Sequence, residues 1–479
     1  MCKTIKFNTN NHKPLILLSA LDWGLGHTTR CIPLIQALQD CGCTVTVAGN
    51  PGQQALLRAE FPHISFVDLA GANLRYGHSR RGTLARLLWQ LPRLYASIRK
   101  EQRWLKGFLQ QNPVDAIIAD NRFGLYARGI PSIFITHQLA VKTGFGPLAD
   151  WLAQRLNYRF IRRFTACWVP DYATAPSLAG SLSHPGRLPG LPVHYLGGLS
   201  RFQARSAPAQ DFYGQDPLAG LPDQALDPPA ANAENADPPT ILQDQGTGSP
   251  VAKPEKTGPQ DQPLSPQLPQ ILFDSLSPAG LFGHPSLDNG HQPKLSRGDY
   301  PSWRDVPSGQ STGIHFELLI ILSGPEPQRS RLENILLEEI NQFPGRVALV
   351  RALPGQQEPP LTGRPQLAVF NHLPAHHLQT LIEHASLIVS RSGYTTVMDL
   401  LKLRRKAILI PTPGQAEQEF LGQHLHRERL AYCAAQEGFS LAKAITAAEQ
   451  FEFAIPAFSM EEYRKVVEAF VDALIARQH

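Results

Sequence analysis

The sequence predicts an α/β protein with two doubly wound domains. Short apolar runs alternate with longer amphipathic runs before residue 203 and again after residue 312, which is the pattern of strand–helix units around a parallel sheet. A proline-rich segment without periodicity separates these two halves. With 479 residues, the chain is also too long for one ordinary hydrophobic core.

The first half, residues 1–202, contains the expected elements of one Rossmann-like domain. In each unit a short apolar run fits a buried strand, and the amphipathic run after it fits a helix that covers the sheet. Strands are expected at residues 15–19, 44–48, 64–67, 116–119, 132–136 and 166–169. Helices are expected at residues 28–40, 83–111 and 148–164.

The middle segment, residues 203–312, differs in composition from both halves. It holds 18 of the chain's 42 prolines, together with many Gln, Asp, Gly and Ser residues. Such a composition buries too little apolar surface to fold, and a structureless loop of this length does not belong inside a compact domain. We therefore predict a disordered insert that links two domains.

The second half, residues 313–479, resumes the alternation and predicts another Rossmann-like domain. Strands are expected at residues 316–322, 347–351, 367–370, 387–389 and 407–410. Helices are expected at residues 326–341, 375–383, 395–403 and 460–476, and the last one is a candidate to pack back on the first domain. Two domains of this kind face each other across a cleft, and ligands bind at the carboxyl ends of their strands.

Composition and charge exclude several classes of function. The net charge of +5 is small for this length and does not indicate nucleic-acid binding. The six cysteines are scattered, and the one close pair, Cys41 and Cys43, has no second pair, so we expect reduced thiols and no metal site. No apolar run has the length of a signal-peptide core or of a membrane span, so a cytoplasmic location is expected.

The most informative stretch is residues 390–399, where an apolar strand runs into a small, hydroxyl-rich turn that opens a helix. Backbone N–H groups at a helix start lack intrahelical partners, and the helix dipole favours negative charge there. Ser392, Gly393, Tyr394 and Thr395 are therefore candidates to bind a phosphate or diphosphate, and Asp399 is placed to reach ribose hydroxyls. An ordinary strand-to-helix turn with Ser392 as the N-cap is the alternative interpretation.

Two further loops of the second half follow expected strands. Ser323 and Gly324 precede Pro325 at a helix start, where N–H donors can surround a diphosphate. Residues 411–419 follow the strand at 407–410, and Gln418 and Glu419 offer hydrogen bonds to sugar hydroxyls. Each loop alone is equally typical of an ordinary turn or a solvated first helical turn.

The first loop of the chain, residues 22–30, follows the first expected strand. Gly24 and Gly26 allow the backbone to approach a ligand closely, although the third glycine of a dinucleotide-binding fingerprint is missing. His27 is a candidate general base for a hydroxyl because an imidazole titrates near neutral pH. Asp22 is a second candidate base, and a histidine that only caps the turn is the alternative.

Together these loops resemble the MurG-like branch of the GT-B glycosyltransferases, in glycosyltransferase family 28. This is the family of the bacterial enzyme that adds N-acetylglucosamine to a lipid-linked peptidoglycan precursor. The resemblance covers most of residues 14–202 and 313–475. It depends on the Gly-Leu-Gly-His sequence at 24–27, on the Arg-Ser-Gly sequence at 391–393, and on Asp399 and Gln418.

The resemblance implies roles for individual residues. It places His27 beside the reaction centre, Asp399 on the nucleotide ribose, and Gln418 on the donor sugar. Glu419 stands where the family has another glutamine, so the donor sugar can differ from that of the family.

Two other loops match the family less closely. Ser323 and Gly324 correspond to its diphosphate loop, here with fewer glycines. His137 and Gln138 resemble its acceptor-side loop in a shortened form. The first glycine-rich loop is also leaner than that of MurG, so the acceptor need not be a peptidoglycan intermediate.

The expected function is transfer of a hexose or N-acetylhexosamine from a nucleotide sugar, with UDP as the expected nucleotide, to a glycan or lipid-linked hydroxyl acceptor. The first domain would bind the acceptor and the second the donor. The resemblance implies inversion at the anomeric carbon, and no metal or other cofactor is expected. A nucleotide-sugar hydrolase or epimerase on the same fold, and a non-catalytic sugar-nucleotide sensor, remain alternatives.

Two expected helices bear on the nature of the acceptor. Residues 86–104 and 151–164 interleave aromatic and aliphatic side chains with arginine and lysine. Helices of this kind can lie on an anionic membrane surface, which would allow peripheral contact with the cytoplasmic face. Core-packing helices with a solvated basic face are an equal alternative.

Overall fold

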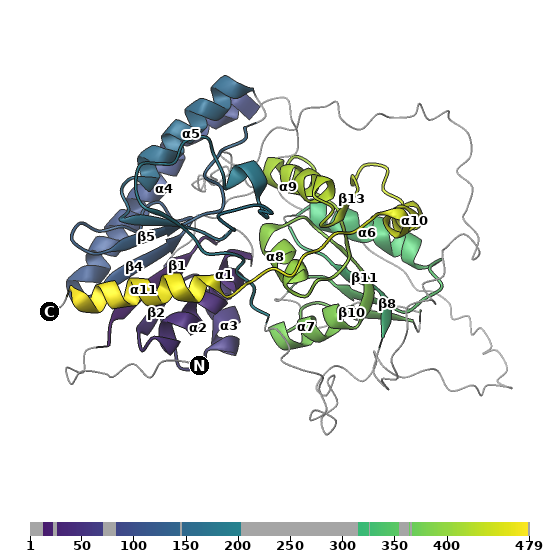
Figure 1. Ribbon diagram of the computed structural model, residues 1–479, viewed down its shortest axis with the longest axis horizontal. Helices are drawn as coiled ribbons and strands as arrows, with labels where there is room; N and C mark the ends of the chain where they lie inside the picture. Colours follow the sequence, from purple (N-terminus) through teal and green to yellow (C-terminus); the bar gives the residue numbers. More distant parts are fainter. Residues whose placement is uncertain are drawn as a thin grey trace, which may run out of the picture.

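The computed structural model describes residues 13–22, 26–69, 83–143, 146–202, 315–324, 326–353, 364 and 366–477, and only the backbone of residues 83–94. The predicted insert at 203–312 lies outside these residues, as do Gly24 and Pro325. Within the described ranges the chain forms two α/β domains that lie side by side (Figure 1). The predicted fold class is confirmed for these two domains.

The first domain contains a parallel sheet of seven strands in the order β3-β2-β1-β4-β5-β6-β7. Its strands are β1 (Leu15–Ala20), β2 (Thr44–Gly49), β3 (Ser65–Asp68), β4 (Ala116–Asp120), β5 (Ser132–Ile135), β6 (Ala166–Val169) and β7 (Val193–Tyr195). Its helices are α1 (Gly26–Arg30), α2 (Ile32–Asp40), α3 (Pro51–Glu60), α4 (Thr83–Gln111), α5 (Pro147–Ile161) and the 3₁₀ helix η1 (Gly180–Leu182). The strand order reverses between β1 and β4, which makes their carboxyl ends the expected ligand-binding position.

The second domain repeats this arrangement with six parallel strands in the order β10-β9-β8-β11-β12-β13. Its strands are β8 (Phe316–Ile321), β9 (Val347–Val350), β10 (Leu367–Phe370), β11 (Ala385–Ser390), β12 (Ala407–Leu409) and β13 (Tyr432–Cys433). Its helices are α6 (Gln328–Ile340), α7 (Ala375–Glu383), α8 (Tyr394–Lys402), α9 (Ala416–Arg427), α10 (Leu441–Gln450) and α11 (Glu462–Ala476). Here the order reverses between β8 and β11, the strands that precede Ser323 and Ser392.

The expected single helix at residues 28–40 is wrong, because α1 ends at Arg30 and α2 begins at Ile32. Pro33 lacks the N–H group that would continue the hydrogen-bond ladder across this point, so it is placed in the first turn of a new helix. The N–H group of Cys31 bonds to the Thr28 carbonyl at 3.2 Å instead. The break leaves α1 as a single short turn that carries His27 and Arg30.

Some elements are not evident from the apolar pattern. Edge strands β7 and β13 are too short to give a periodic signal, since they have three and two residues. Helix α3 buries only Gln53 and Leu57, so few apolar residues mark it in the sequence. Its start is instead defined by a capping box, in which Asn50 and Gln53 bond to each other's backbone N–H groups.

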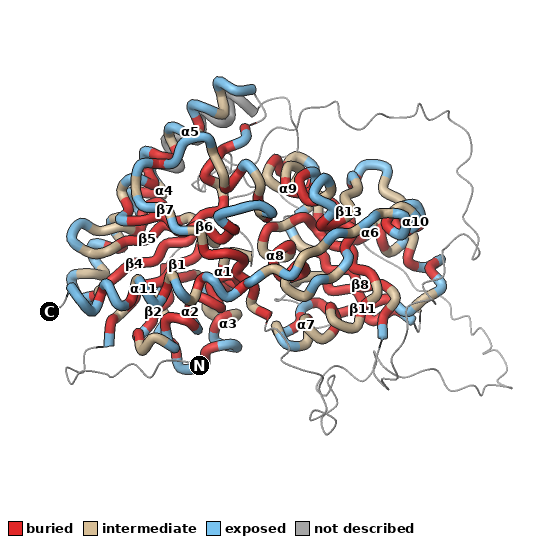
Figure 2. The backbone as a smooth tube through the Cα atoms, viewed as in Figure 1, coloured by how far each residue is buried: buried red, intermediate tan, exposed pale blue. Residues whose placement is uncertain are grey.

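The strands form the buried interior of both domains (Figure 2). One apolar cluster continues across the domain boundary, where Val397 and Met398 of α8 join Leu178 and Leu199 of the first domain. This apolar contact joins the two domains near the polar loops at their strand ends. No helix within the described residues is long and apolar enough to span a membrane.

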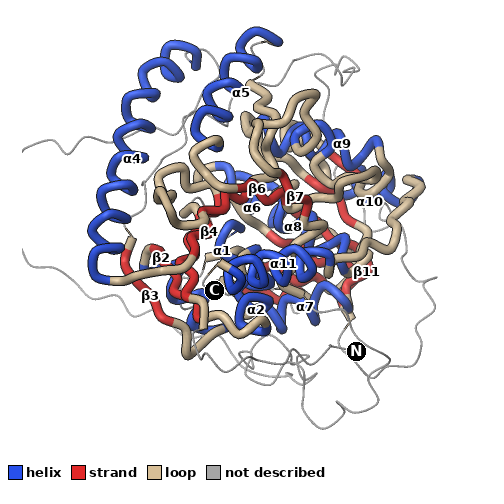
Figure 3. Tube along the Cα trace, turned by 60° about the vertical axis from the view of Figure 1, so that its left-hand side comes forward, coloured by secondary structure: helices blue, strands red, loops and turns tan. Residues whose placement is uncertain are grey.

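Helix α11 returns from the second domain and lies along the first domain beside α2 (Figures 1 and 3). Phe470 packs against the Trp168 ring with centroids 5.3 Å apart. Arg464 forms an ion pair with Asp40 at 2.8 Å. Residues of the last helix therefore contribute to the core of the first domain, as expected for a helix with one apolar stripe.

Candidate active site

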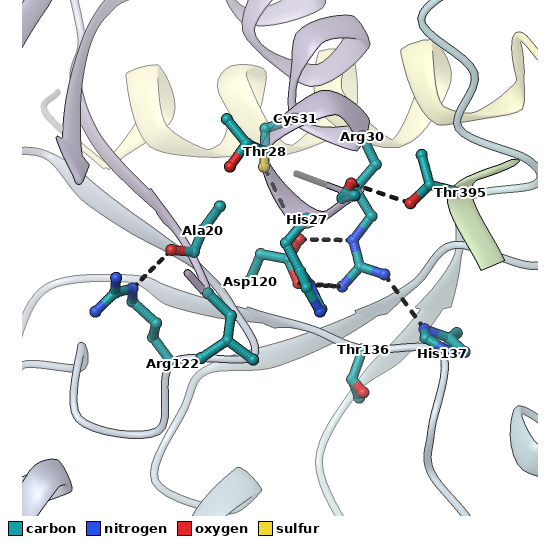
Figure 4. Close-up of polar contacts among 12 residues, drawn as sticks. Ala20, His27, Thr28, Arg30, Cys31, Asp120, Arg122, Thr136, His137 and Thr395 are labelled. Atoms are coloured by element: carbon teal, nitrogen blue, oxygen red, sulfur yellow. Dashed lines mark hydrogen bonds and ion pairs between the residues drawn. The ribbon is translucent and has the colours of Figure 1, made fainter. Parts of the chain in front are cut away.

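Two strand ends that are distant in the sequence meet at the switch point of the first domain. β1 pairs with β4, and Ala20 lies opposite Asp120, so the loop after β1 lies next to the last residue of β4. The His27 ring points toward Asp120, with 3.2 Å between His27 Nδ1 and Asp120 Oδ1 (Figure 4). The His27 side chain is 18% exposed, whereas that of Asp120 is 1% exposed. A carboxylate behind an imidazole orients the ring and stabilises its protonated form.

Arg30 joins this pair from the end of α1. Its Nε atom donates to Asp120 Oδ2 at 2.6 Å, and its Nη2 atom donates to Asp120 Oδ1. The same Nη2 lies 2.8 Å from His27 Nδ1. Because arginine only donates and a carboxylate only accepts, Nδ1 of His27 can bond to one of them at a time. When Nδ1 carries the proton and donates to Asp120, the outer Nε2 atom is free to accept a proton.

The electrostatics of the pair suit a general base. Burial, followed by the charge of Arg30, lowers the pKa of His27 below its usual value, while Asp120 opposes this shift. Burial alone would raise the pKa of Asp120, but Arg30 and then His27 hold it well below its usual range. His27 is thus neutral and Asp120 ionised near pH 7, the protonation states that a base and its orienting carboxylate require.

Asp120 and Arg30 are site residues that the sequence interpretation overlooks. Asp120 is the last residue of β4, one beyond the strand expected at 116–119, and 93 residues separate it from His27. The available signal is a carboxylate directly after an apolar strand, because strand ends gather at one edge of a parallel sheet. Arg30 lies within the first loop, but its buried partner is invisible in the sequence.

His137 connects the two domains. It follows β5, and its ring is buried. Its Nδ1 atom lies 3.3 Å from Arg30 Nη1, and its Nε2 atom lies 2.7 Å from Oε1 of Glu417 in the first turn of α9. The ring also stacks on Tyr394 with centroids 4.0 Å apart. Both ring nitrogens are engaged within the protein, and the predicted acceptor-side role of His137 stays a prediction.

The helix start predicted to bind phosphate lies against the His27 loop. α8 begins after Gly393, a residue without a side chain to cap the first N–H groups of the helix. Thr395 Oγ1 donates to the Gly26 carbonyl at 3.0 Å. A Cβ atom on Gly26 would lie only 3.1 Å from that hydroxyl, so glycine permits this close approach. The candidate base and the candidate phosphate site are therefore neighbours.

The other residues of this turn have defined roles in the structure. Ser392 is not the N-cap of α8, because its buried hydroxyl donates to the Gln418 carbonyl at 2.8 Å. Tyr394 donates from its hydroxyl to the Pro170 carbonyl of the first domain at 2.5 Å. The side chains of this turn thus hold loops together, and its backbone N–H groups are the part available to an anion.

Several buried polar atoms at the switch point of the second domain have no hydrogen-bond partner among the described residues. They are Ser390 Oγ at the end of β11, Arg391 Nε directly after it, and Thr412 Oγ1 after the neighbouring strand β12. Gly324, with φ of +98°, brings the turn after β8 close to them, because a Cβ atom there would lie 3.4 Å from Thr412 Oγ1. Since buried polar groups normally have partners, these atoms indicate a place for a polar ligand.

Arg391 supplies positive charge at this position. Its guanidinium donates to the carbonyls of Ile410, Pro411 and Gln328 at 2.8–3.3 Å. Burial lowers its pKa to about 10, so the group stays charged at neutral pH. The carbonyl groups are neutral, so they do not cancel the charge of the buried guanidinium. A buried cation of this kind favours an anion nearby.

Asp399 lies on the buried face of α8 and contacts the first domain. Ser200 Oγ donates to Asp399 Oδ1 at 2.8 Å, and Arg201 Nε lies 3.2 Å from Oδ2. Burial raises the pKa of Asp399, and Arg201 opposes that shift. Its predicted contact with a ribose stays a prediction, and that contact would exchange one of these two partners for a sugar hydroxyl.

The two side chains expected at the donor sugar instead shape their own loop. Gln418 Oε1 accepts from the Thr412 N–H group at 3.0 Å, and Glu419 Oε1 accepts from the Gly414 N–H group at 2.9 Å. The residue before them, Glu417, instead points to the first domain, where it contacts His137. A donor-sugar contact of Gln418 or Glu419 stays a prediction.

The remaining candidates lie at the edges of the site. Asp22 is buried, with Oδ1 3.9 Å from Arg122 Nη2, and burial raises its pKa although Arg122 opposes this. Ser323 and Gln138 are half-buried beyond β8 and β5. The catalytic role of Asp22 and the binding roles of the other two stay predictions.

Solved structures with the same arrangement of domains are glycosyltransferases. The chain is similar to the glycotransferase of kitacinnamycin, with a TM-score of 0.50 and 12% identity over 97% of this chain and 96% of that chain. UGT89C1 of Arabidopsis thaliana, complexed with UDP-L-rhamnose, gives a TM-score of 0.50 and 14% identity over 97% and 95%. MurG of Acinetobacter baumannii gives a TM-score of 0.43 and 13% identity over 97% of this chain and 100% of that chain. The first two similarities show the two-domain GT-B fold.

A family model matches within the second domain. Residues 357–465 match the Glycosyltransferase family 28 C-terminal domain, a range that includes residues 390–399 and 411–419. Fold and domain together define a glycosyltransferase of the GT-B fold. The predicted resemblance to glycosyltransferase family 28 is confirmed for this part of the second half. A search of curated proteins found no significant match.

Proposed function

We propose that this glycosyltransferase moves a hexose or N-acetylhexosamine from a UDP-sugar to a hydroxyl of a glycan or lipid-linked acceptor. One observation carries the proposal: the His27 loop contacts the uncapped start of α8 through Thr395 and Gly26. A base for the acceptor and an anion site for the leaving group are thereby held at one domain boundary. UGT89C1, which has the same fold, was solved in complex with UDP-L-rhamnose, which supports a nucleotide-sugar donor.

The proposed reaction is a single displacement. His27 Nε2 takes the proton of the acceptor hydroxyl while its oxygen forms a bond to the anomeric carbon. The bond between that carbon and the diphosphate oxygen breaks, and the nucleoside diphosphate leaves with the electron pair. Attack from the face opposite the leaving group inverts the anomeric configuration. The N–H groups at the start of α8 and the charge of Arg391 stabilise the negative charge that develops.

We further propose that no metal is needed for this reaction. The helix start and the buried Arg391 can provide the charge stabilisation that a divalent cation would otherwise give to a leaving diphosphate. Among the described residues, no three His, Cys, Asp or Glu side chains are grouped as metal ligands. Equal transfer rates with and without EDTA are expected, and loss of transfer in EDTA that Mg²⁺ or Mn²⁺ restores would contradict the proposal.

A panel of nucleotides and nucleotide sugars tests the donor assignment. UDP and one or more UDP-sugars are expected to raise the melting temperature of the full-length protein, because ligands that bind only the folded state stabilise it. The stabilising UDP-sugar is then incubated with and without candidate glycan and lipid-linked acceptors. Transfer that depends on an acceptor supports the proposal. Equal release of UDP without any acceptor would indicate a hydrolase or epimerase, and no stabilisation by any pyrimidine nucleotide would refute the donor site.

We also propose that the protein works in the cytoplasm and contacts the membrane surface through α5. Helices α4 and α5 extend along one side of the first domain (Figure 3). On α5, Leu148, Trp151 and Leu152 are 72%, 55% and 54% exposed, and Arg155 lies 5.6 Å from the Trp151 ring. Exposed apolar side chains beside a cation suit an anionic lipid surface. The corresponding side chains of residues 86–94 on α4 lie outside the described residues.

Vesicle sedimentation tests this contact. The protein is expected to sediment with vesicles that contain phosphatidylserine and much less with pure phosphatidylcholine vesicles. The double substitution Trp151→Ser/Leu152→Ser is expected to remove most of the binding. Ile475→Ser is the control, because Ile475 is also an exposed apolar residue, at 38%, but lies on α11, which packs beside α2. Equal sedimentation of both variants would contradict the proposal.

A further inference from the structure

A chain of hydrogen bonds runs from the second domain to the candidate base of the first. Glu417 Oε1 lies 2.7 Å from His137 Nε2, and His137 Nδ1 lies 3.3 Å from Arg30 Nη1. Arg30 in turn binds Asp120 and lies 2.8 Å from His27 Nδ1. We propose that Glu417 positions the base of the other domain through this chain, so that His27 is ready for proton transfer only when the domains are in contact. The inference depends on the proposed transferase function.

Between Arg30 and Glu417, the donors and acceptors allow only one hydrogen-bonding arrangement. Arginine only donates, so His137 Nδ1 accepts from Arg30 and the ring proton lies on Nε2. Nε2 then donates to Glu417, which must be ionised to accept. Burial disfavours the ionised form, but the neighbouring His137 and then His27 and Arg30 hold the pKa of Glu417 below its usual value. His137 thus links an anion of one domain to a cation of the other through its two ring nitrogens.

The orientation of Arg30 decides which atom of His27 carries the proton. His137 holds the Arg30 guanidinium at Nη1, and the Nε and Nη2 atoms then face Asp120. In this orientation Asp120 Oδ1 can still accept a hydrogen bond from His27 Nδ1. In this state the closest partner of Nη2 is Asp120 Oδ1, although His27 Nδ1 is also within reach at 2.8 Å. Loss of the His137 bond would let the guanidinium turn, so that Nη2 donates to His27 Nδ1 in place of Asp120. The ring proton would then move to Nε2, and the atom facing the acceptor could no longer take a proton.

This arrangement couples the orientation of His27 to the contact between the two domains. Glu417 in α9 and Tyr394 in α8 both belong to the second domain, and they contact His137 at its Nε2 atom and its ring face. Separation of the domains breaks both contacts together. A base that is set only in the closed state would limit premature reaction with water, because domain closure also excludes solvent.

Removing the Glu417 charge should shift the pH profile of kcat/KM in a predictable direction. The charged or titratable groups that act on His27 are Asp22, Arg30, Asp120, His137 and Glu417. Because Glu417 and protonated His27 attract each other, loss of the carboxylate makes His27 harder to protonate. The acid limb of the kcat/KM profile should therefore move to lower pH.

The decisive experiment compares Glu417→Gln with Glu428→Gln in the full-length protein. Both remove one negative charge from α9 or its end, but Glu428 is exposed and, among the described residues, forms its ion pairs with His424 and Arg427 of α9 itself. Glu417→Gln is expected to lower kcat by about 10- to 100-fold, as for loss of a hydrogen bond to a charged group, with the donor KM within about twofold. The acid limb should move in this variant alone. A raised donor KM with unchanged kcat would overturn the inference and make Glu417 a donor contact.

Nitrogen NMR of histidine-labelled protein separates this inference from the proposed function. The His137 resonances, assigned by their loss in His137→Gln, are expected to show the Nε2–H tautomer, and Glu417→Gln should change that tautomer or its shifts. A His137 protonated at Nδ1 would overturn the inference whether or not sugar is transferred. If no donor supports transfer, the proposed function fails, and the NMR result still decides whether the hydrogen-bond chain exists.

Discussion

His27→Ala is expected to lower kcat for sugar transfer by about 10²- to 10⁴-fold, the usual contribution of a general base. His27 is the partly exposed imidazole at the site, with a buried carboxylate behind it. Its removal takes away the proposed proton acceptor for the acceptor hydroxyl. Binding of UDP should stay within about twofold, because the N–H groups of α8 lie on the other domain.

The pH dependence gives a second readout for His27. Burial and then Arg30 lower its pKa, so the acid limb of kcat/KM should lie below the usual imidazole pKa of about 6.5. His27→Ala should abolish this limb. His63→Ala, which removes an exposed histidine of the same domain, is the control and should leave rate and profile unchanged. Retention of activity within threefold in His27→Ala, or a parallel loss of UDP binding, would disprove its role as the base.

Asp120→Ala is expected to lower the free energy of unfolding by about 3–5 kcal/mol, because it leaves the buried Arg30 guanidinium without its carboxylate. Transfer should also fall, since His27 loses the group that orients it. Urea unfolding followed by circular dichroism measures the loss. The double variant Asp120→Ala/Arg30→Met should recover much of this stability, because an uncharged pair leaves no uncompensated charge.

The pH dependence of unfolding has a definite sign. The pKa of Asp120 in the folded protein is lower than in the unfolded chain, where it is about 3.9. Its stabilising contribution is therefore complete above that value and is lost as pH falls toward the folded-state pKa, where the unfolded state binds more protons. Asp120→Ala should remove this part of the acid dependence. If single and double variants are equally unstable, the ion pair does not account for the loss.

Much of the architecture could be predicted from the order of apolar runs. A parallel strand buried on both faces gives a continuous apolar run, so β1, β2, β4, β5, β6, β8 and β11 are visible in the sequence. The break between α1 and α2 was missed although Pro33 marks it, because the amphipathic pattern continues across it. Short edge strands and helix α3, which has few apolar residues, carry too little apolar signal to be recognised.

The site could be predicted in part for the same reason. Loops at strand ends are recognisable by glycine and hydroxyl residues, and this located His27 and the turn before α8. Asp120 and Glu417 carry no such local mark, because their importance comes from partners 93 and 280 residues away. The strand order, which places β4 beside β1, is what brings the first of these pairs together.

The sequence by itself determined the two α/β domains, the positions of their ligand-binding loops and a histidine suited to proton transfer, because these depend on local periodicity and on residue chemistry. Only the tertiary structure decided that Asp120 and Arg30 hold His27, and that Glu417 reaches His137 across the domain boundary. Protonation states depend on which charges meet in a buried space. That is a property of how the strands and domains are arranged, and it cannot be read from neighbours along the chain.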